Sequence, residues 1–324
     1  MPILMPAAAL IGGFVLLVWA ADRFVIGAGA TARNLGVSPL IIGLTVVGFA
    51  TSAPEMFTAA IAAGQGNPGL AIGNAIGSNI ANIGLVIGLT AVISPLVIHS
   101  RILKREYPLL FAITGLAMLL MIDGDLGVAD GVVLVIACGA LIYWMVRLGK
   151  RERDSDALAE DLDVEIPRAM PMRKALFLLV LGLVVLIAGS KILVWGAVDL
   201  ARIMDVSDLV IGLTIVAVGT SLPELAAAIA SVLKKEDDLA IGNVIGSNMF
   251  NTLAVLPLPG LIAPGGFSPM ILSRDLPVMI IMTILLYLIS KGIMSSNKIG
   301  CGKGTVLLAG FIGYQIWVYM TAAH

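Results

Sequence analysis

Long apolar runs separated by short polar stretches fill almost the whole chain. Most of these runs are long enough to cross the roughly 30 Å hydrocarbon core of a bilayer as a helix. We predict about ten of them, with the fourth and ninth short, near residues 3–30, 39–65, 69–98, 107–122, 126–147, 174–202, 208–233, 239–263, 276–291 and 304–323. The pattern predicts an all-α integral membrane protein with about ten transmembrane helices.

Composition and charge support this prediction and orient the chain. Only 13% of the 324 residues are charged, against roughly 25% in soluble domains. If the N-terminus is outside, 16 of the 20 basic residues fall in inner loops, as the positive-inside rule requires. We therefore expect a multi-pass protein of the cell membrane (inner or plasma), with both termini outside. The first run has no basic residues before it, so we expect a retained helix rather than a signal peptide.

The chain contains an internal repeat. Residues 38–82 align without a gap onto 207–251, and 22 of the 45 aligned positions are identical. We therefore divide the chain into residues 1–150, an acidic cytoplasmic linker at 151–173, and residues 174–324. Each half holds about five spans, and an odd number forces the second half to insert upside down. Two inverted five-helix repeats are typical of secondary transporters.

Each half places a proline and a glutamate inside an apolar run, in VVGFATSAPEMF and IVAVGTSLPELA. Pro54 and Pro223 cannot donate a backbone hydrogen bond and should loosen the helix, which frees carbonyl groups that need a partner within the membrane. Glu55 and Glu224 are costly there and indicate function. Four hydroxyl groups lie on the same helix faces as these glutamates, because they precede them by three or four positions. They belong to Thr51, Ser52, Thr220 and Ser221.

A second pair of motifs, GNAIGSNIAN and GNVIGSNMFN, adds further oxygen atoms. Their serine and asparagine pairs at i and i+4 face one neighbour, and these residues are Ser78, Asn82, Ser247 and Asn251. We expect the other asparagines, Asn74, Asn79, Asn243 and Asn248, to form hydrogen bonds between helices. The pooled set holds carboxylate, hydroxyl, amide and carbonyl oxygens without His or Cys, which suits Na⁺ and Ca²⁺. The expected metal ligands include Glu55, Glu224, Asn82 and Asn251.

With these two motifs, each present twice, the sequence resembles the sodium/calcium exchanger superfamily, especially its compact prokaryotic calcium/sodium antiporters. The resemblance covers essentially the whole chain. It implies a midplane cation site formed by the second, third, seventh and eighth helices. Its side-chain ligands would be Thr51, Ser52, Glu55, Ser78, Asn82, Thr220, Ser221, Glu224, Ser247 and Asn251, and its backbone carbonyls those of Gly48 and Ala217.

The resemblance also implies that the first and sixth helices, near Phe14–Arg33 and Leu183–Arg202, slide past the rest during exchange. This chain departs from the family pattern in three places. Ala50 stands where glycine is usual, Gly48 where alanine is common, and Asn251 where some relatives carry aspartate. Only two obvious carboxylates remain, so the sequence leaves open how many ions are exchanged and whether protons take part.

These observations predict a secondary active antiporter that exchanges Ca²⁺ for Na⁺ by alternating access, not an enzyme. A cation/proton antiporter that uses the same two glutamates is the alternative, and a cation channel is more remote. We expect no cofactor beyond the transported ions. The expected partners are Ca²⁺, Na⁺, possible H⁺ and the lipid bilayer, without nucleic acid or an obligate protein partner.

Overall fold

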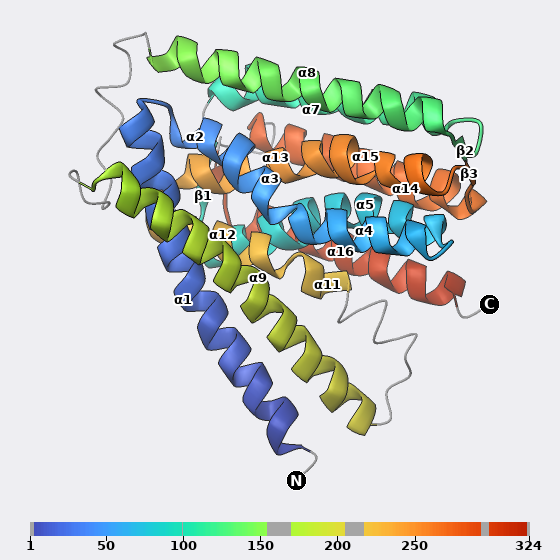
Figure 1. The fold of residues 1–324 in the computed structure, drawn as a ribbon, viewed down its shortest axis with the longest axis horizontal. Coiled ribbons are helices and arrows are strands. Elements are labelled where there is room, and N and C mark those ends of the chain that lie inside the picture. Colours follow the sequence, from blue (N-terminus) through green and yellow to red (C-terminus); the bar gives the residue numbers. More distant parts are fainter. Residues whose placement is uncertain (1–2, 99, 154–169, 205–216, 293–297, 323–324) are drawn as a thin grey trace.

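The structure is a computed structural model that describes residues 3–98, 100–153, 170–204, 217–292 and 298–322. Most of the acidic linker therefore lies outside the described residues, as does the beginning of the span predicted at 208–233. Two long helices, α1 (Leu4–Leu35) and α9 (Met172–Ile203), lie side by side and project from a bundle formed by the other helices (Figure 1).

The bundle consists mainly of helices that are interrupted or joined end to end. In the first half the elements are α2 (Pro39–Ile42), η1 (Gly43–Val47), α3 (Gly48–Thr51), α4 (Ala53–Gly64), α5 (Pro68–Ala81), η2 (Asn82–Ile87), α6 (Gly88–Ile93), β1 (Leu96–Val97), α7 (Ser100–Met121), β2 (Asp125–Leu126) and α8 (Val128–Arg153). In the second half they are α11 (Ala217–Thr220), α12 (Leu222–Leu233), α13 (Asp237–Phe250), η5 (Asn251–Val255), α14 (Pro257–Ile262), β3 (Gly265–Gly266), η6 (Ile271–Asp275), α15 (Leu276–Ser290), β4 (Lys298–Ile299) and α16 (Cys301–Ala322). The elements labelled η are π-helical turns.

Eight helices or joined helices among the described residues are long and apolar enough to cross a membrane. They confirm the prediction of a helical multi-pass membrane protein. The two other predicted spans are represented by α7 and by α12, a shorter apolar helix of 12 residues.

The fourth and ninth spans are longer than the sequence predicted. Helix α7 continues through Arg105 and Glu106, where the guanidinium Nε lies 2.6 Å from a fully buried carboxylate oxygen. The ninth span begins with η6 and includes Arg274 and Asp275, whose charged groups are 2.7 Å apart. A hydropathy profile scores each charge by itself, so it began both spans too late.

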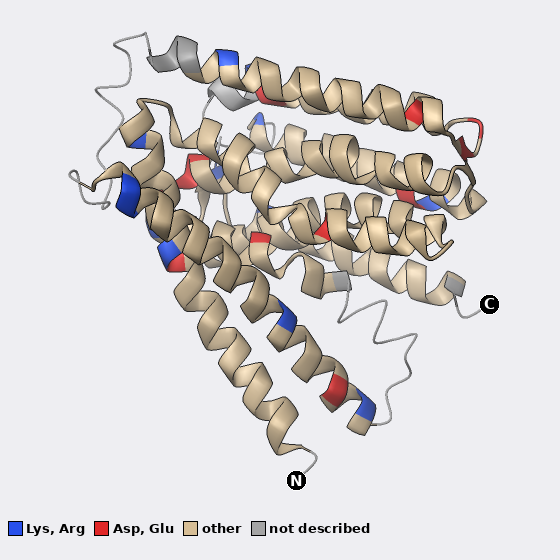
Figure 2. Cartoon of the chain, viewed as in Figure 1, with Lys and Arg blue, Asp and Glu red and all other residues tan. Residues whose placement is uncertain are grey.

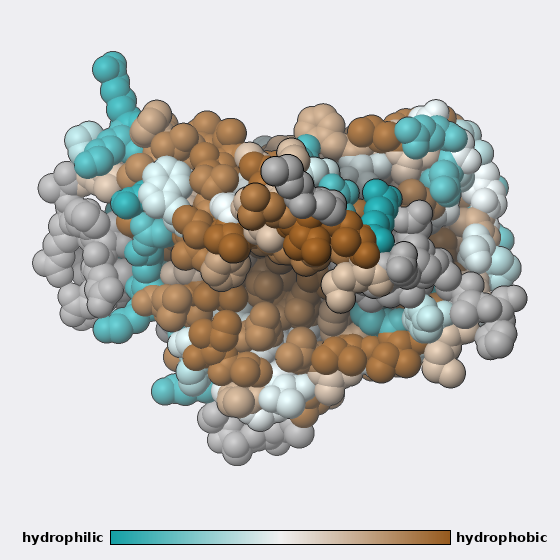
Figure 3. Space-filling view, turned by 90° about the horizontal axis from the view of Figure 1, so that it is seen from below, coloured by the Kyte–Doolittle hydropathy of each residue, from teal (hydrophilic) through white to brown (hydrophobic). Residues whose placement is uncertain are grey.

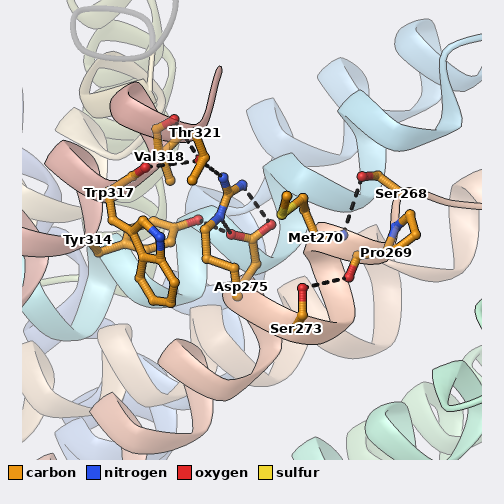
Figure 4. Close-up of polar contacts among 10 residues, drawn as sticks. Ser268, Pro269, Met270, Ser273, Asp275, Tyr314, Trp317, Val318 and Thr321 are labelled. Carbon is orange, nitrogen blue, oxygen red and sulfur yellow. Dashed lines mark hydrogen bonds and ion pairs between the residues drawn. The ribbon is translucent and has the colours of Figure 1, made fainter. Parts of the chain in front are cut away.

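The Arg274–Asp275 pair also anchors the last helix (Figure 4). The Tyr314 hydroxyl of α16 donates to the same Asp275 oxygen at 3.0 Å, and Arg274 donates to the hydroxyl of Thr321. Among the polar side chains drawn there, both charges have partners inside the protein. We therefore assign this cluster to the packing of α16 against η6 and α15.

Helices α1 and α9 pack together through glycines. Each has 32 residues, which corresponds to about 48 Å at 1.5 Å per residue, so both must tilt to fit the bilayer. A Cβ atom on Gly27 would lie 2.3 Å from the backbone nitrogen of Leu179, and one on Gly182 would lie 2.6 Å from that of Phe24. Such contacts allow two backbones to approach closely, as is common in membrane helices.

Two short antiparallel ribbons connect the halves at opposite ends of the bundle (Figure 1). Strand β1 of the first half pairs with β4 of the second, and β2 of the first pairs with β3 of the second. Charged residues lie mostly near the helix ends, and few of them lie in the middle of the bundle (Figure 2). The few charges in the middle therefore define the region where a site must be sought.

Candidate functional site

The helix is interrupted at corresponding serines in the two halves. Ser52 separates α3 from α4 and has ψ near −2°, and Ser221 separates α11 from α12 and has ψ near 5°. The following prolines occupy the first turn of α4 and α12, where a missing N–H costs little. The glutamates stand one position further on, in the first turn of the same helices and 1% exposed. The helix N-termini thus carry buried carboxylates, which the helix dipole favours there.

Each glutamate is fixed by an asparagine of the neighbouring helix. Asn74 of α5 donates to the backbone carbonyl of Glu55 at 3.2 Å. Asn243 of α13 donates to that of Glu224 at 3.4 Å. Both pairs are separated by 19 residues. The expectation that these two asparagines bond between helices is confirmed. Their role in positioning the glutamates was not predicted.

The two halves meet at a group of hydroxyl and carbonyl oxygens around Thr51. Its Oγ1 lies 3.1 Å from Oγ of Ser247 and 3.2 Å from Oδ1 of Asn243. The carbonyl oxygen of Gly48 is 3.4 Å from the Thr51 hydroxyl and 3.3 Å from the Ser247 hydroxyl. The predicted ligands Thr51, Ser247 and Gly48 therefore lie together, on two different halves of the chain.

Close backbone packing makes this meeting possible. A Cβ on Gly48 would lie 2.9 Å from the backbone nitrogen of Ser247, and one on Gly246 would lie 2.5 Å from the carbonyl oxygen of Leu44. The departure from the family pattern at Gly48 thus has a local reason, because the backbone of α13 passes directly against it.

Asparagines also connect the region where α5 continues into η2 with the region where α13 continues into η5. Asn82 donates to Oδ1 of Asn248 at 3.0 Å, and Asn79 donates to the hydroxyl of Thr252 at 2.9 Å. Asn82 is the first residue of η2, and Asn251 is the first residue of η5. Widened turns of this kind frequently occur at functional sites.

Many polar atoms of the predicted ligands are buried and have no hydrogen-bond partner among the described residues. They are Oγ of Ser52 and Ser221, Oε2 of Glu55, both carboxylate oxygens of Glu224, Oδ1 of Asn82, and Oδ1 and Nδ2 of Asn251. A buried polar atom left without a partner costs free energy. Such a concentration of unpartnered oxygen atoms indicates a place for a cation.

The structure places most of the predicted side-chain ligands in the interior. Ser78 is 5% exposed, and the exposed fractions of Thr51, Ser52, Glu55, Asn82, Ser221, Glu224, Ser247 and Asn251 are 0–1%. Thr220 is half-buried, and the backbone of Ala217 begins α11. Helix α4 packs on α5, and α12 packs on α13. In addition, α5 contacts η5 and α12 contacts η2, so these residues converge from both halves. Their role as ion ligands stays a prediction.

A cavity of about 570 Å³ opens beside this group. It lies between α4, α9 and the α11–α12 junction, and its lining includes Pro54, Thr220 and Pro223. Most of its wall is apolar and includes Phe57 and Trp195, and Lys191 is among its polar lining residues. Figure 3 shows a hollowed, mainly apolar surface on the side of the molecule from which α1 and α9 extend. The cavity thus leads from the surface to the interrupted helices.

Comparisons with known proteins show the family to which the chain is related. The family model described as "Sodium/calcium exchanger protein" matches residues 5–147 and 174–320. The chain is 48% identical to the putative antiporter CaxA of Alkalimonas amylolytica, over 95% of this chain and 96% of that one. It is 33% identical to the sodium/calcium exchanger MaX1 of Methanosarcina acetivorans, over 95% and 96%. A solved structure of the sodium-calcium exchanger NCX_Mj, soaked with zero Na⁺ and Ca²⁺, superposes with a TM-score of 0.82 at 34% identity and covers 99% of this chain and 100% of that one.

Proposed function

Because the chain belongs to the sodium/calcium exchanger protein family, we propose that it exchanges Ca²⁺ for Na⁺ at the group of buried oxygen atoms described above. Family membership supports cation exchange as the activity. The assignment of the ions to particular residues is ours. Glu55 and Glu224 supply the charge, and the surrounding hydroxyl, amide and carbonyl oxygens complete the coordination that hard cations prefer.

The observation that carries this proposal is the set of buried oxygen atoms without partners at Glu55, Glu224, Asn82 and Asn251. The described structure contains no group of three or more His, Cys, Asp or Glu side chains that could hold a metal ion. Hydroxyl, amide and backbone oxygens must therefore complete any ion's coordination. Na⁺ and Ca²⁺ accept such ligands, whereas softer metals favour imidazole or thiolate.

The charge of the site explains why transport would be coupled. With both glutamates ionised, the empty site carries about −2 in a region of low dielectric constant, which is costly to move through the protein barrier. One Ca²⁺ neutralises this charge, and so do two Na⁺. We infer that only occupied states reorient readily, and that the two ions exclude one another because they compete for the same carboxylates.

The two halves suggest how access would alternate. The cavity is lined by Ser190, Val194 and Phe57, among others. The residues 169 positions away in the other half are Ala21, Val25 and Ala226, and these are packed in an apolar cluster between α1 and α12. One side is thus open where its repeat equivalent is closed. Exchange of these two arrangements would expose the site to the opposite side of the membrane.

The test is Ca²⁺ uptake by proteoliposomes driven by an outward Na⁺ gradient at equal pH. We expect Na⁺-dependent uptake by the wild type and a loss of at least 100-fold in Glu55→Gln and in Glu224→Gln. Asp125→Asn, which neutralises an exposed carboxylate in strand β2 at one end of the bundle, should transport like the wild type.

Two results would contradict the proposal in different ways. Full exchange by both glutamine variants would show that the carboxylates are not the site. Uptake that ignores Na⁺ but follows a pH gradient would make the protein a cation/proton antiporter that uses the same residues.

A further inference from the structure

Two ion pairs join α1 to the turn between α12 and α13. Lys234 Nζ lies 2.6 Å from Oδ1 of Asp22, and an Arg33 guanidinium nitrogen lies 3.5 Å from Oε1 of Glu236. The first pair is partly exposed. The second is largely buried, with side-chain exposures of 14% and 3%. We refer to these four residues as the clasp.

The clasp has no counterpart of the same kind in the other half. The residues equivalent to Lys234 and Glu236, 169 positions earlier, are Gln65 and Asn67, which carry no charge. Asn67 instead caps α5, since its Oδ1 accepts from the backbone N–H of Leu70 at 3.2 Å. The turn that carries the clasp is thus charged, whereas its repeat equivalent is neutral.

The backbone of the two turns is otherwise alike. Gly66 has a φ of 77°, and Lys235 at the equivalent position has a φ of 59°. Among the described residues, Lys235 is the one non-glycine residue with positive φ. A side chain is disfavoured in this conformation. The charged turn therefore keeps the shape of the neutral turn at a cost in backbone strain at Lys235.

The clasp spans the closed side of the molecule. The apolar cluster beneath it contains Ala21, Val25 and Ala226 of α1 and α12, and it occupies the place that is equivalent to the cavity in the other half. The clasp joins the same two helices at the edge of this cluster, on the side where α1 ends and α13 begins. Opening this side by moving α1 would separate both ion pairs.

We propose that the clasp sets the balance between the two access states. The Lys234–Asp22 pair holds α1 against the α12–α13 turn, and Arg33 offsets the buried charge of Glu236, which would otherwise favour opening of that side. This proposal rests on the alternating access described under the proposed function. Removing one partner of a largely buried ion pair leaves the other charge uncompensated. The clasp residues act on the equilibrium between states without touching the ions, so they are positioning residues.

The surroundings of Glu236 make this balance sensitive to protons. Its neighbours are Arg33 from α1, Asp237 and Asp238 from the start of α13, and the lysines of its own turn. Burial, partly opposed by Arg33, raises the pKa of Glu236 to about 7. If opening exposes this carboxyl to water and returns its pKa towards 4.5, protons bind more tightly to the closed state. Closure is then favoured at low pH, and this contribution is lost as the pH rises through about 7.

The test measures opening directly. The reporter of opening is a cysteine in place of Ala226, a buried residue of the apolar cluster that is 8% exposed. The reference protein carries Ala226→Cys together with Cys138→Ser. Labelling by a thiol reagent is followed in purified protein with saturating Na⁺, relative to labelling of the exposed Cys301 in the same molecule. Glu236→Gln carries the same two thiols and therefore controls for the effect of pH on their reactivity.

The variants distinguish an effect of the charges of Arg33 and Glu236 from an effect of side-chain packing. We expect Arg33→Gln to label about fivefold faster, since Glu236 then lacks its compensating charge. Glu236→Gln should label no faster than the reference, and the double variant Arg33→Gln/Glu236→Gln should return to within about twofold of it. Arg147→Gln, the same substitution at an exposed arginine near the end of α8, is the control. Lys234→Gln, which opens the exposed pair, should give an increase of about twofold.

Labelling at different pH values tests the contribution of Glu236 separately. Between pH 6 and pH 8 the relative labelling should rise several-fold in the reference protein and stay constant in Glu236→Gln. Unchanged labelling in Arg33→Gln, or a double variant that labels as fast as Arg33→Gln, would overturn the proposal. Because labelling does not require transport, either result would leave the glutamate test of the proposed function standing on its own.

Discussion

At the scale of single residues, Asn243 contributes to the site in two ways. It donates to the carbonyl of Glu224 and accepts from the hydroxyl of Thr51, so it connects the two halves at the buried oxygen atoms. Its counterpart Asn74 makes the equivalent bond to Glu55. The position of each carboxylate therefore depends on an amide in the next helix.

We predict that Asn243→Ala weakens Ca²⁺ binding without unfolding the protein. Two hydrogen bonds are lost, each worth about 1 kcal/mol, and about 1.4 kcal/mol corresponds to a tenfold change in affinity. The half-saturating Ca²⁺ concentration for exchange should rise about thirtyfold if both losses weaken binding in full. Asn67→Ala, the same substitution at the cap of α5, should lower thermal stability and leave this concentration within about twofold. An unchanged Ca²⁺ dependence in Asn243→Ala would remove this residue from the site.

The sequence indicated the buried polar residues of the candidate site better than their arrangement. Glu55, Glu224 and their neighbouring hydroxyls could be named because a carboxylate inside an apolar run is costly wherever the run lies. The bond from Asn243 to Glu224 could not, because it depends on how two helices cross. The clasp pair of Arg33 and Glu236 is separated by 203 residues, and no local pattern indicates such a contact.

At the scale of elements, local chemistry determined which features could be predicted. Pro54 and Pro223 marked the interruptions of the second and seventh spans, since proline cannot continue a backbone hydrogen-bond ladder. The π-helical turns η1, η2 and η5 had no such marker, because one additional residue per turn hardly alters an apolar pattern. The length of α7 was missed because Arg105 and Glu106 compensate each other only after folding.

Neighbouring glycines of α1 provide a test of how the long helices pack. A Cβ on Gly13 would lie 2.7 Å from the backbone nitrogen of Leu193, whereas Gly12 is exposed and has open space at this position. We predict that Gly13→Leu lowers the melting temperature in detergent by several degrees and reduces exchange, because overpacking separates α1 from α9. Gly12→Leu should change neither. Equal melting temperatures for both variants would show that this close contact does not hold the pair together.

At the scale of the whole molecule, the two ribbons and the charged ends distinguish the faces of the protein. The β1–β4 ribbon, the end of α1 and the clasp turn lie towards one end of the bundle, and the β2–β3 ribbon and the end of α16 lie towards the other (Figure 1). The charge pattern of the sequence predicts that the first of these ends is cytoplasmic. The site lies between them, buried in the middle of the bundle.

The native cysteines allow this orientation to be tested. Cys301 is exposed directly after β4, whereas Cys138 is buried within α8. We predict that a membrane-impermeant thiol reagent fails to label Cys301 in intact cells and labels it after permeabilisation. Ser268→Cys in a Cys301→Ser background places an exposed thiol just after β3, at the opposite end, and should be labelled in intact cells. The reverse pattern would invert the orientation, and the cavity beside α9 would then open towards the cytoplasm, with the clasp closing the outer side.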